Sequence, residues 1–298
     1  MFKVIKVLNR ISSHPLNKNK KFKSILRFLK WQTISRILPN PINVKFVNDT
    51  KLSISRGMTG ATGNIYSGLS EYEEMGFLLH YLRKDETFVD IGANVGSFTV
   101  LASGAIGAKT ISFEPLKKTF KHLKKNISLN KIDNLVQAKN IGLSDKNNIL
   151  FFTKNRDTMN RVIFNRSTKD DVEKIKVKKL DDVIKDIEVS FIKIDVEGFE
   201  LPVLRGAKKI LSQNNLNALI VETNENGTNY GYNDSMVNKF LISIGFNAVK
   251  YNPRDRKFVK FDKFSWNKGN TIYLKNIDLA KLRVNEINNF ILSTGDKI

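Results

Sequence analysis

The 298-residue chain contains no cysteine, so neither a disulfide framework nor a thiolate metal site can form, which fits a reducing compartment. It also lacks any apolar run that reaches the ~18 residues of a membrane span. The hydrophobic start from Met1 to Val7 is interrupted by lysines and is unlike a signal peptide. These absences predict a cytoplasmic protein, with any membrane contact peripheral to the inner face of the membrane.

Acidic residues are scarce, with 29 Asp and Glu against 50 Lys and Arg, for a net charge of +21. Residues 1–36 hold ten of the basic residues and no acidic ones, and apolar residues recur between them at helical spacing. Three interpretations remain open. The segment is a basic helix packed on the core, or residues 1–38 contact an anionic membrane. Alternatively it binds nucleic acid through Trp31 and its phenylalanines, although no recognised module is present.

The length suits one α/β domain with extensions. We expect a basic helical extension over 1–43, a domain over 44–276 with its core at about 87–275, and a C-terminal helix or tail over 277–298. Strands alternate with helices through the core, which predicts a parallel sheet. The expected strands are 87–91, 109–113, 135–139, 189–194, 217–222, 246–251 and 270–274, the helices are 95–105, 116–129, 200–212 and 234–243, and a hairpin at 149–153 and 175–179 follows the third strand.

The most informative segment runs from Phe88 to Phe98, where an apolar strand meets a glycine turn and then a helix. Glycines let the backbone approach a ligand closely, and the start of a helix offers free N–H groups to anionic ligand groups. Glu114 ends the next strand, 22 residues past Gly92, where a carboxylate suits the two ribose hydroxyls of a nucleoside. The pattern predicts a site for an adenosine-containing cofactor.

The spacing of the turn argues against a dinucleotide, because Asn94 and Ser97 stand where G-x-G-x-x-G needs glycine. The chain instead has Asp90-x-Gly92-x-x-x-Gly96, the turn of S-adenosylmethionine (SAM) methyltransferases. There the ligand is an amino acid, whose ammonium an aspartate can meet and whose carboxylate backbone N–H groups can meet. An ordinary strand–helix turn of an α/β domain is the alternative.

A resemblance to a known family becomes specific further along the chain. The stretch from Phe191 to Glu200, followed by Val203-Leu204-Arg205-Gly206-Ala207, resembles the K-I-D-V-E-G-x-E…V-L-x-G-A signature of the FkbM methyltransferases. Together with the blocks at 90–96, 113–115, 180–182, 220–222 and 269–272, the similarity covers about residues 60–275. It implies a Rossmann-like class I methyltransferase fold, with a seven-stranded, mostly parallel sheet and an antiparallel edge strand.

Carboxylates stand at the ends of four predicted strands, at Asp90, Glu114, Asp195 and Glu222. Ligands in such sheets lie at the carboxyl ends of the strands, so we expect these groups to converge. Because the sulfonium of SAM is positive, its pocket should be moderately anionic and free of nearby lysine. The residues expected to bind the cofactor are Asp90, Gly92, Asn94, Gly96, Glu114, Gly142 and Asp195.

An alcohol acceptor needs a carboxylate or histidine to remove its proton, or a divalent metal to acidify it. Asp195 and Glu197 are the leading candidates for the base, because they follow the strand that usually faces the methyl group in this superfamily. Glu222, with Glu225, comes second. A metal such as magnesium is the alternative, with Asp195 or Glu197 as a ligand; a helix cap or loop brace is the structural interpretation of these side chains.

The segment from Gly60 to Gly68 precedes the core and is rich in turn-forming residues. A connecting loop is the simpler interpretation, and a lid over the cofactor or acceptor is the sharper one.

Taken together, the sequence predicts transfer of a methyl group from SAM to a hydroxyl. By resemblance, the acceptor is a sugar of a glycan or a secondary metabolite. The charge suggests a nucleic-acid methyltransferase as an alternative, but the chain has neither an RNA module nor an N-P-P-Y motif, so no nucleic-acid partner is expected. A non-catalytic SAM-binding adaptor is the other alternative, against which the intact motif residues argue.

Overall fold

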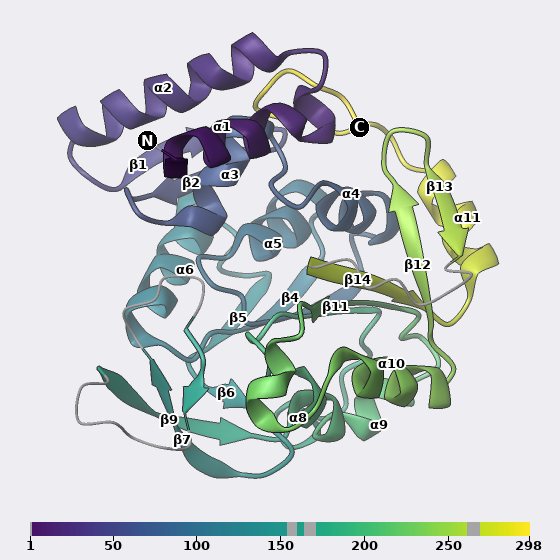
Figure 1. The fold of residues 1–298 in the computed structure, drawn as a ribbon. Coiled ribbons are helices and arrows are strands. Elements are labelled where there is room, and N and C mark those ends of the chain that lie inside the picture. The colour runs from purple at the N-terminus through teal and green to yellow at the C-terminus, as the bar shows by residue number, and fades with distance from the viewer. Residues whose placement is uncertain (1, 154–159, 164–170, 261–268) are drawn as a thin grey trace.

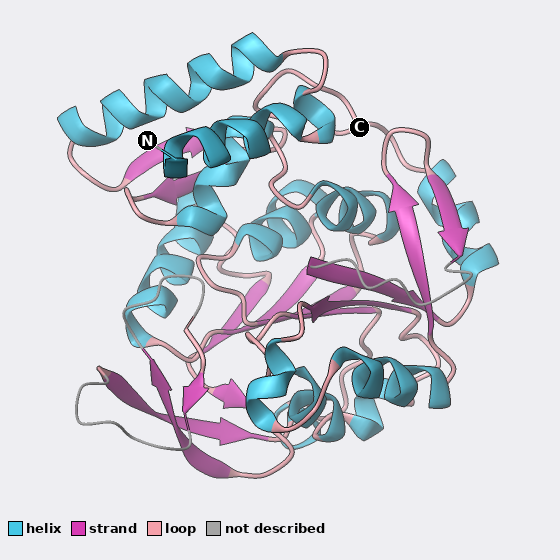
Figure 2. Ribbon diagram, in the orientation of Figure 1, coloured by secondary structure: helices cyan, strands magenta, loops and turns pink. Residues whose placement is uncertain are grey.

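The computed structural model describes residues 2–153, 160–163, 171–260 and 269–298. A central eight-stranded sheet lies between two layers of helices (Figures 1 and 2), in the order β13-β12-β14-β11-β10-β3-β4-β5. The strands are β3 (Thr87–Ile91), β4 (Lys109–Phe113), β5 (Val136–Lys139), β10 (Phe191–Ile194), β11 (Ala218–Thr223), β12 (Asn247–Asn252), β13 (Lys257–Lys260) and β14 (Gly269–Leu274).

Strands β5, β4, β3, β10 and β11 are parallel, as predicted, and β14 is antiparallel to both of its neighbours. This order confirms the Rossmann-like class I fold. Two details differ from the expectation. The antiparallel β14 lies between β11 and β12 rather than at the edge, and an eighth strand, β13, forms that edge by pairing with β12. A four-residue edge strand flanked by lysines carries little hydrophobic signal, so the sequence did not reveal it.

The helices cover the two faces of the sheet. One layer contains α4 (Tyr72–Tyr81), α5 (Ser97–Thr99), η2 (Val100–Ile106) and α6 (Lys117–Leu129), and the other α7 (Leu180–Val183), α8 (Glu200–Arg205), α9 (Lys208–Leu211) and α10 (Asp234–Ser243). Alternate residues of each strand face opposite layers: Phe88 and Phe191 pack with the first, and Val89 and Ile192 with the second. The helix predicted at 95–105 is one α turn continued by a π-helix, and that at 200–212 is interrupted at Gly206.

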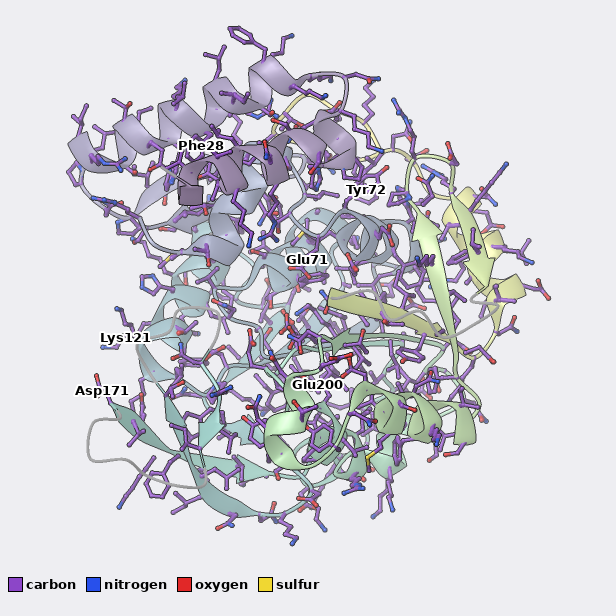
Figure 3. All side chains as sticks on the ribbon, in the orientation of Figure 1. Phe28, Glu71, Tyr72, Lys121, Asp171 and Glu200 are labelled. Carbon is purple, nitrogen blue, oxygen red and sulfur yellow. The ribbon has the colours of Figure 1, made fainter. Side chains whose placement is uncertain are left out.

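The basic N-terminal segment packs on the rest of the chain (Figure 1). It comprises α1 (Phe2–Ser13), η1 (Pro15–Asn17), α2 (Lys21–Ile37), β1 (Ile42–Lys45), β2 (Lys51–Ile54) and α3 (Thr59–Ser67). Ile11, Phe28 and Trp31 are buried in the same hydrophobic cluster as the sheet, so the first interpretation of this segment is observed. Phe28 points inward in Figure 3. Across the described residues, no helix is both long and apolar enough to span a membrane.

Helix α3 corrects the interpretation of residues 60–68 as a connecting loop, while the lid interpretation stays a prediction. The segment is a regular helix whose Ala61, Asn64 and Tyr66 are buried. Close packing explains why position 63 is glycine, because a Cβ there would lie 2.8 Å from the Cβ of Ser70. Glycine lowers helix propensity, which is why local sequence favoured a loop.

A second, four-stranded sheet follows β5. It is formed by β6 (Gly142–Leu143), β7 (Asn148–Thr153), β8 (Val162–Ile163) and β9 (Val172–Lys178), in the order β6-β9-β7-β8, and the antiparallel β7–β9 pair is the predicted hairpin. At the C-terminus, α11 (Ile277–Asn285) precedes a tail in which Phe290 and Ile298 exchange backbone hydrogen bonds. The domain boundaries at 43 and 276 stay predictions.

Candidate active site

The glycine turn after β3 has the backbone its sequence predicts. Gly92 and Gly96 have φ angles of 76° and 90°, and Asn94 is also left-handed at 52°. Gly92 is further constrained by a neighbouring strand end: a Cβ there would lie 1.8 Å from the carbonyl oxygen of Asp195. Only glycine allows the β3 and β10 strand ends to come this close.

Glu114, at the end of β4, lines the cavity beside this turn and is only 5% exposed. Its Oε2 accepts a hydrogen bond from the Asn94 N–H (3.0 Å), and its Oε1 accepts one from the Leu116 N–H (2.9 Å). Burial raises the pKa of the Glu114 carboxyl to about 7, and these two hydrogen bonds oppose the shift. Each carboxylate oxygen has a second lone pair, so the group can still accept hydrogen bonds from a ligand.

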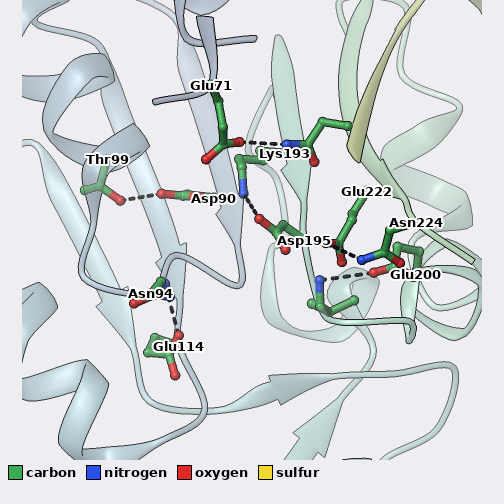
Figure 4. Close-up of polar contacts among 12 residues, drawn as sticks. Glu71, Asp90, Asn94, Thr99, Glu114, Lys193, Asp195, Glu200, Glu222 and Asn224 are labelled. Atoms are coloured by element: carbon green, nitrogen blue, oxygen red, sulfur yellow. Dashed lines mark hydrogen bonds and ion pairs between the residues drawn. The ribbon is translucent and has the colours of Figure 1, made fainter. Parts of the chain in front are cut away.

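Asp90 occupies a different place from the one its predicted role suggests. The side chain is 1% exposed and is not among the residues that line the cavity. Its Oδ2 accepts a hydrogen bond from the Thr99 hydroxyl at 2.6 Å, as Figure 4 shows, while Oδ1 has no hydrogen-bond partner among the described residues. The structure therefore places Asp90 beneath the turn, where it braces the first helical turn.

Lys193 contradicts the expectation of a pocket without lysine. It is 3% exposed, lies on β10 and lines the cavity, with its ammonium 2.7 Å from Asp195 Oδ2 and 4.7 Å from the Phe98 ring centre. Burial lowers the pKa of Lys193, but the charges of Asp195, Glu71 and Asp90 outweigh it and raise the pKa overall. In the sequence, Lys193 stands out only as part of the FkbM-like motif. No local pattern indicates that several carboxylates would surround it and make a buried cation compatible with an anionic pocket.

Asp195, Glu197 and Glu222 meet at the ends of β10 and β11, with one carboxylate oxygen of each within 4.8 Å of the others. We call these three the carboxylate cluster. Asn226 Nδ2 donates to Glu197 (3.0 Å) and Asn224 Nδ2 donates to Glu222 Oε1 (2.7 Å). Oε2 of Glu222 has no hydrogen-bond partner among the described residues.

The electrostatics of the cluster favour protonation or a bound cation. Burial raises the pKa values of Glu197 and Glu222, and the charge of Asp195 raises them further. Like charges this close cannot all be ionised without compensation. The cluster can therefore hold a proton or a divalent cation.

A buried glutamate that the sequence analysis passed over holds the loop of this cluster. Glu200, 3% exposed, accepts hydrogen bonds at 3.1 Å from the N–H groups of both Val196 and Gly198. Glu197 lies between them with a left-handed φ of 54°. The two hydrogen bonds to Glu200 thus hold the backbone on both sides of Glu197.

The whole cavity has a volume of about 360 Å³ and runs from Glu114 and Leu116 at one end to Glu71, Glu222 and Asn270 at the other. Glu71, just before α4, accepts a hydrogen bond from Asn270 Nδ2 at 2.6 Å (Figures 3 and 4). Because 199 residues separate this pair, no local pattern could have placed Glu71 in the site.

Of the predicted cofactor residues, Gly92, Asn94, Glu114 and Asp195 line this cavity, as do the catalytic candidates Glu197 and Glu222. Gly142 does not. It lies on β6, where a Cβ would come within 2.9 Å of Val177, beside a separate small void. Gly96 shapes the turn, with its Cα facing Leu123, without lining the cavity.

The glycine turn, Glu114 and the converging strand ends form a cavity suited to an adenosine-containing cofactor, at the edge of an α/β sheet. Residues 90–251 match the family described as the methyltransferase FkbM domain. The chain therefore belongs to the FkbM methyltransferase family, and this region forms its SAM-dependent methyltransferase domain.

The individual proteins and solved structures that the chain is similar to have low sequence identity to it. The chain is 29% identical over 146 residues to Methyltransferase 1 of Beauveria bassiana (strain ARSEF 2860), a match that covers 41% of this chain and 58% of that protein. Solved structures with similarity include an rRNA methylase from Streptococcus thermophilus, at 13% identity with a TM-score of 0.40, covering 68% of this chain and 93% of that one. M. capricolum TrmK, in complex with S-adenosylhomocysteine (SAH), has 12% identity and a TM-score of 0.39, covering 68% of each chain.

Proposed function

We propose that this protein transfers a methyl group from SAM to a hydroxyl of its acceptor. The observation that carries the proposal is the carboxylate cluster at the ends of β10 and β11, in the same cavity as Glu114 and the glycine turn. An alcohol is a poor nucleophile until its proton leaves, and a buried carboxylate with a raised pKa is suited to accept that proton.

The cavity fits the cofactor on two grounds. The glycine turn lines the cavity with Gly92, Ala93 and Asn94, and Glu114 keeps acceptor capacity for ribose hydroxyls. At the opposite end the carboxylates outnumber the single buried ammonium of Lys193, which suits a sulfonium. SAM, when bound, supplies the electrophilic methyl group.

Two routes to the acceptor alkoxide use the same residues. In the first, Asp195 or Glu197 accepts the hydroxyl proton directly, with Glu222 second, and Lys193 holds the Asp195 carboxylate in place from 2.7 Å. In the second, the three carboxylates hold a divalent cation such as magnesium, which acidifies the hydroxyl. The unpartnered Oε2 of Glu222 supports the second route, because it leaves an oxygen available to a ligand.

For the acceptor, we propose a hydroxyl on a sugar of a glycan or on a secondary metabolite, as the family resemblance suggests. A nucleic-acid acceptor has less support, since the sequence contains neither a recognised RNA-binding module nor an N-P-P-Y motif. We further propose peripheral contact with an anionic membrane. Phe22, Leu26 and Leu29 recur along the outer side of α2, each about half exposed or more, among lysines.

The test is methyl transfer from radiolabelled SAM to a panel of glycans, nucleotide sugars and, as a comparison, tRNA and rRNA. Transfer to a hydroxyl of a glycan or metabolite supports the proposal, whereas transfer only to RNA would overturn it. Repeating the assay with a chelator, then with added magnesium, separates the two routes. Activity lost and restored assigns the metal route, and unchanged activity assigns direct proton removal.

A further inference from the structure

A second cavity, of about 570 Å³, lies between the N-terminal helices and α3. Its walls come from α1, α2, α3 and the turn before α3, elements that pack together at the top of Figure 1. We call it the N-terminal cavity. Neither the glycine turn and Glu114 nor the carboxylate cluster lines it, so the residues proposed for cofactor binding and proton removal give this cavity no role.

One side of the N-terminal cavity is apolar and aromatic. Ile11, Phe28, Trp31 and Tyr66 line it, and each is no more than 8% exposed. The Phe28 and Tyr66 rings meet edge to face with their centres 5.4 Å apart, which holds this wall rigid. A wall of fixed aromatic rings suits the flat, apolar face of a ring.

The other side of the N-terminal cavity is cationic. Arg10, Arg36 and Arg56 line it, all three are exposed at its mouth, and among the described residues no carboxylate lies within ion-pair distance of any of them. Arg36 donates hydrogen bonds to Gln32, whereas no hydrogen bond is seen for the guanidinium of Arg10 or Arg56. Arginine forks bind carboxylate and phosphate oxygens in pairs.

The two cavities adjoin. Arg10, Gly60 and Glu71 line both of them, so the N-terminal cavity meets the cofactor cavity at its Glu71 end. That end carries the carboxylate cluster, while Glu114 marks the other end. A molecule in the N-terminal cavity can therefore extend a hydroxyl toward the cluster without displacing a nucleoside held at Glu114.

We propose that the N-terminal cavity binds the methyl acceptor, and that the acceptor is an anionic glycoside whose carboxylate or phosphate lies at the arginines while its apolar ring face lies on Trp31 and Phe28. This inference rests on the proposed function and narrows its acceptor class. It also gives the basic N-terminal segment a role in recognition, since only α1, α2 and the residues around α3 contribute these arginines and rings.

The probes are phenyl β-glucuronide and phenyl β-glucoside, which differ by one carboxylate, together with phenyl phosphate. Calorimetry on the full chain saturated with SAH should show roughly tenfold tighter binding of the glucuronide than of the glucoside, because a charge-assisted pair forms only with the acid. Phenyl phosphate that binds more tightly than the glucoside also supports the proposal. The preference should shrink as salt rises.

The variant that tests the site is Arg56→Gln, since this exposed residue lines only the N-terminal cavity. It should weaken glucuronide binding roughly three- to tenfold and leave glucoside and SAH binding unchanged. Arg205→Gln is the matched control, because it removes the same charge from an exposed arginine of α8. Its glucuronide affinity should equal that of the unaltered chain.

Three results would overturn the inference: equal affinity for the acid and the glucoside, an equal effect of the two arginine variants, or displacement of the glucuronide by SAH. Failure of the chain to bind SAH at all would instead contradict the proposed function. The two failures are thus distinguished in one set of titrations.

Discussion

Two buried carboxylates at opposite ends of the cofactor cavity have very different surroundings. Glu114 accepts one backbone hydrogen bond on each oxygen, and it is not part of the carboxylate cluster found among the described residues. Glu222 has one oxygen without a hydrogen-bond partner among the described residues, and it meets Asp195 and Glu197. Both oxygens of Glu114 have hydrogen-bond donors from its own loop, which suits a group that binds a ligand without changing its charge. Glu222 has an oxygen without a donor and two carboxylates beside it, which suits a group whose charge changes during a reaction.

The strongest test of this contrast is to remove a single charge from the cluster. Asp195→Asn or Glu197→Gln should lower kcat by ~10²–10⁴-fold, the range for a general base, while SAH affinity stays close to that of the unaltered chain. Steady-state kinetics on the true acceptor and calorimetry with SAH measure the two quantities. If both variants keep full turnover, the base is elsewhere, and Glu222→Gln and Glu225→Gln are the next variants to assay.

Removal of the buried cation at the same end should affect folding. Lys193→Met leaves the carboxylates of Asp195, Glu71 and Asp90 without their compensating charge, so we expect a loss of about 3–5 kcal/mol in the free energy of unfolding at pH 8. The loss should shrink at pH 5 as the carboxylates gain protons. Denaturant titration at the two pH values measures it.

The matched control for that variant is Lys281→Met, which breaks an exposed ion pair with Asp278 and should change stability by less than about 1 kcal/mol. Equal losses of stability in the two lysine variants would show that the buried ion pair contributes no more to the free energy of unfolding than the exposed one.

At the other end, Glu114→Ala should weaken SAM binding by about 1.5–3 kcal/mol, the range for hydrogen bonds to a charged group. Asp90→Ala should weaken it too. The structure suggests an indirect route for Asp90, through loss of the 2.6 Å contact that holds Thr99 and the first turn of the helix. Unchanged affinity in both variants, measured by calorimetry, would contradict the predicted cofactor site.

The pH dependence of SAM binding also tests the role of the Glu114 carboxylate. Because the pKa of Glu114 is raised to about 7, the group is largely protonated at pH 6 and becomes a full acceptor only above pH 7. If ribose hydroxyls bind the ionised form, SAM affinity should rise by up to about tenfold between pH 6 and pH 8.

The same raised pKa predicts that, without cofactor, the contribution of Glu114 to the free energy of unfolding is greatest below pH 4.5 and falls as pH rises toward 7. In Glu114→Gln, the pH dependence of SAM affinity and that of the free energy of unfolding should both become weaker.

The smallest expected effect concerns the outer side of α2. Replacing the exposed Lys23 and Lys30 by glutamine should weaken binding to anionic vesicles by about 1 kcal/mol for each charge. Phe22→Ser, at a side chain that is 73% exposed, should weaken it without affecting the fold. Co-sedimentation with anionic and with neutral vesicles checks this. Equal binding to the two vesicle types would rule out an electrostatic membrane contact.

The comparison also shows what a sequence of this kind can predict. The β3 turn, the Glu114 strand end and the positions of the parallel strands follow from local patterns, because glycine spacing and strand–helix alternation are short-range signals. The Glu71–Asn270 hydrogen bond and the N-terminal cavity depend on residues far apart in the chain, so no local spacing encodes them. Helix α3 was missed because packing against Ser70 outweighs the low helix propensity of its glycines.

The approach between Gly92 and the Asp195 carbonyl has a mechanical consequence. A Cβ added at Gly92 would lie 1.8 Å from that oxygen, so any side chain at this position would push the two strand ends apart. The Asp195 N–H also donates a 3.0 Å hydrogen bond to Ile91, which ties the two strand ends together. The turn after β3 and the loop after β10, which carries Asp195 and Glu197, are therefore held together by the backbone, so their relative position is set when the chain folds.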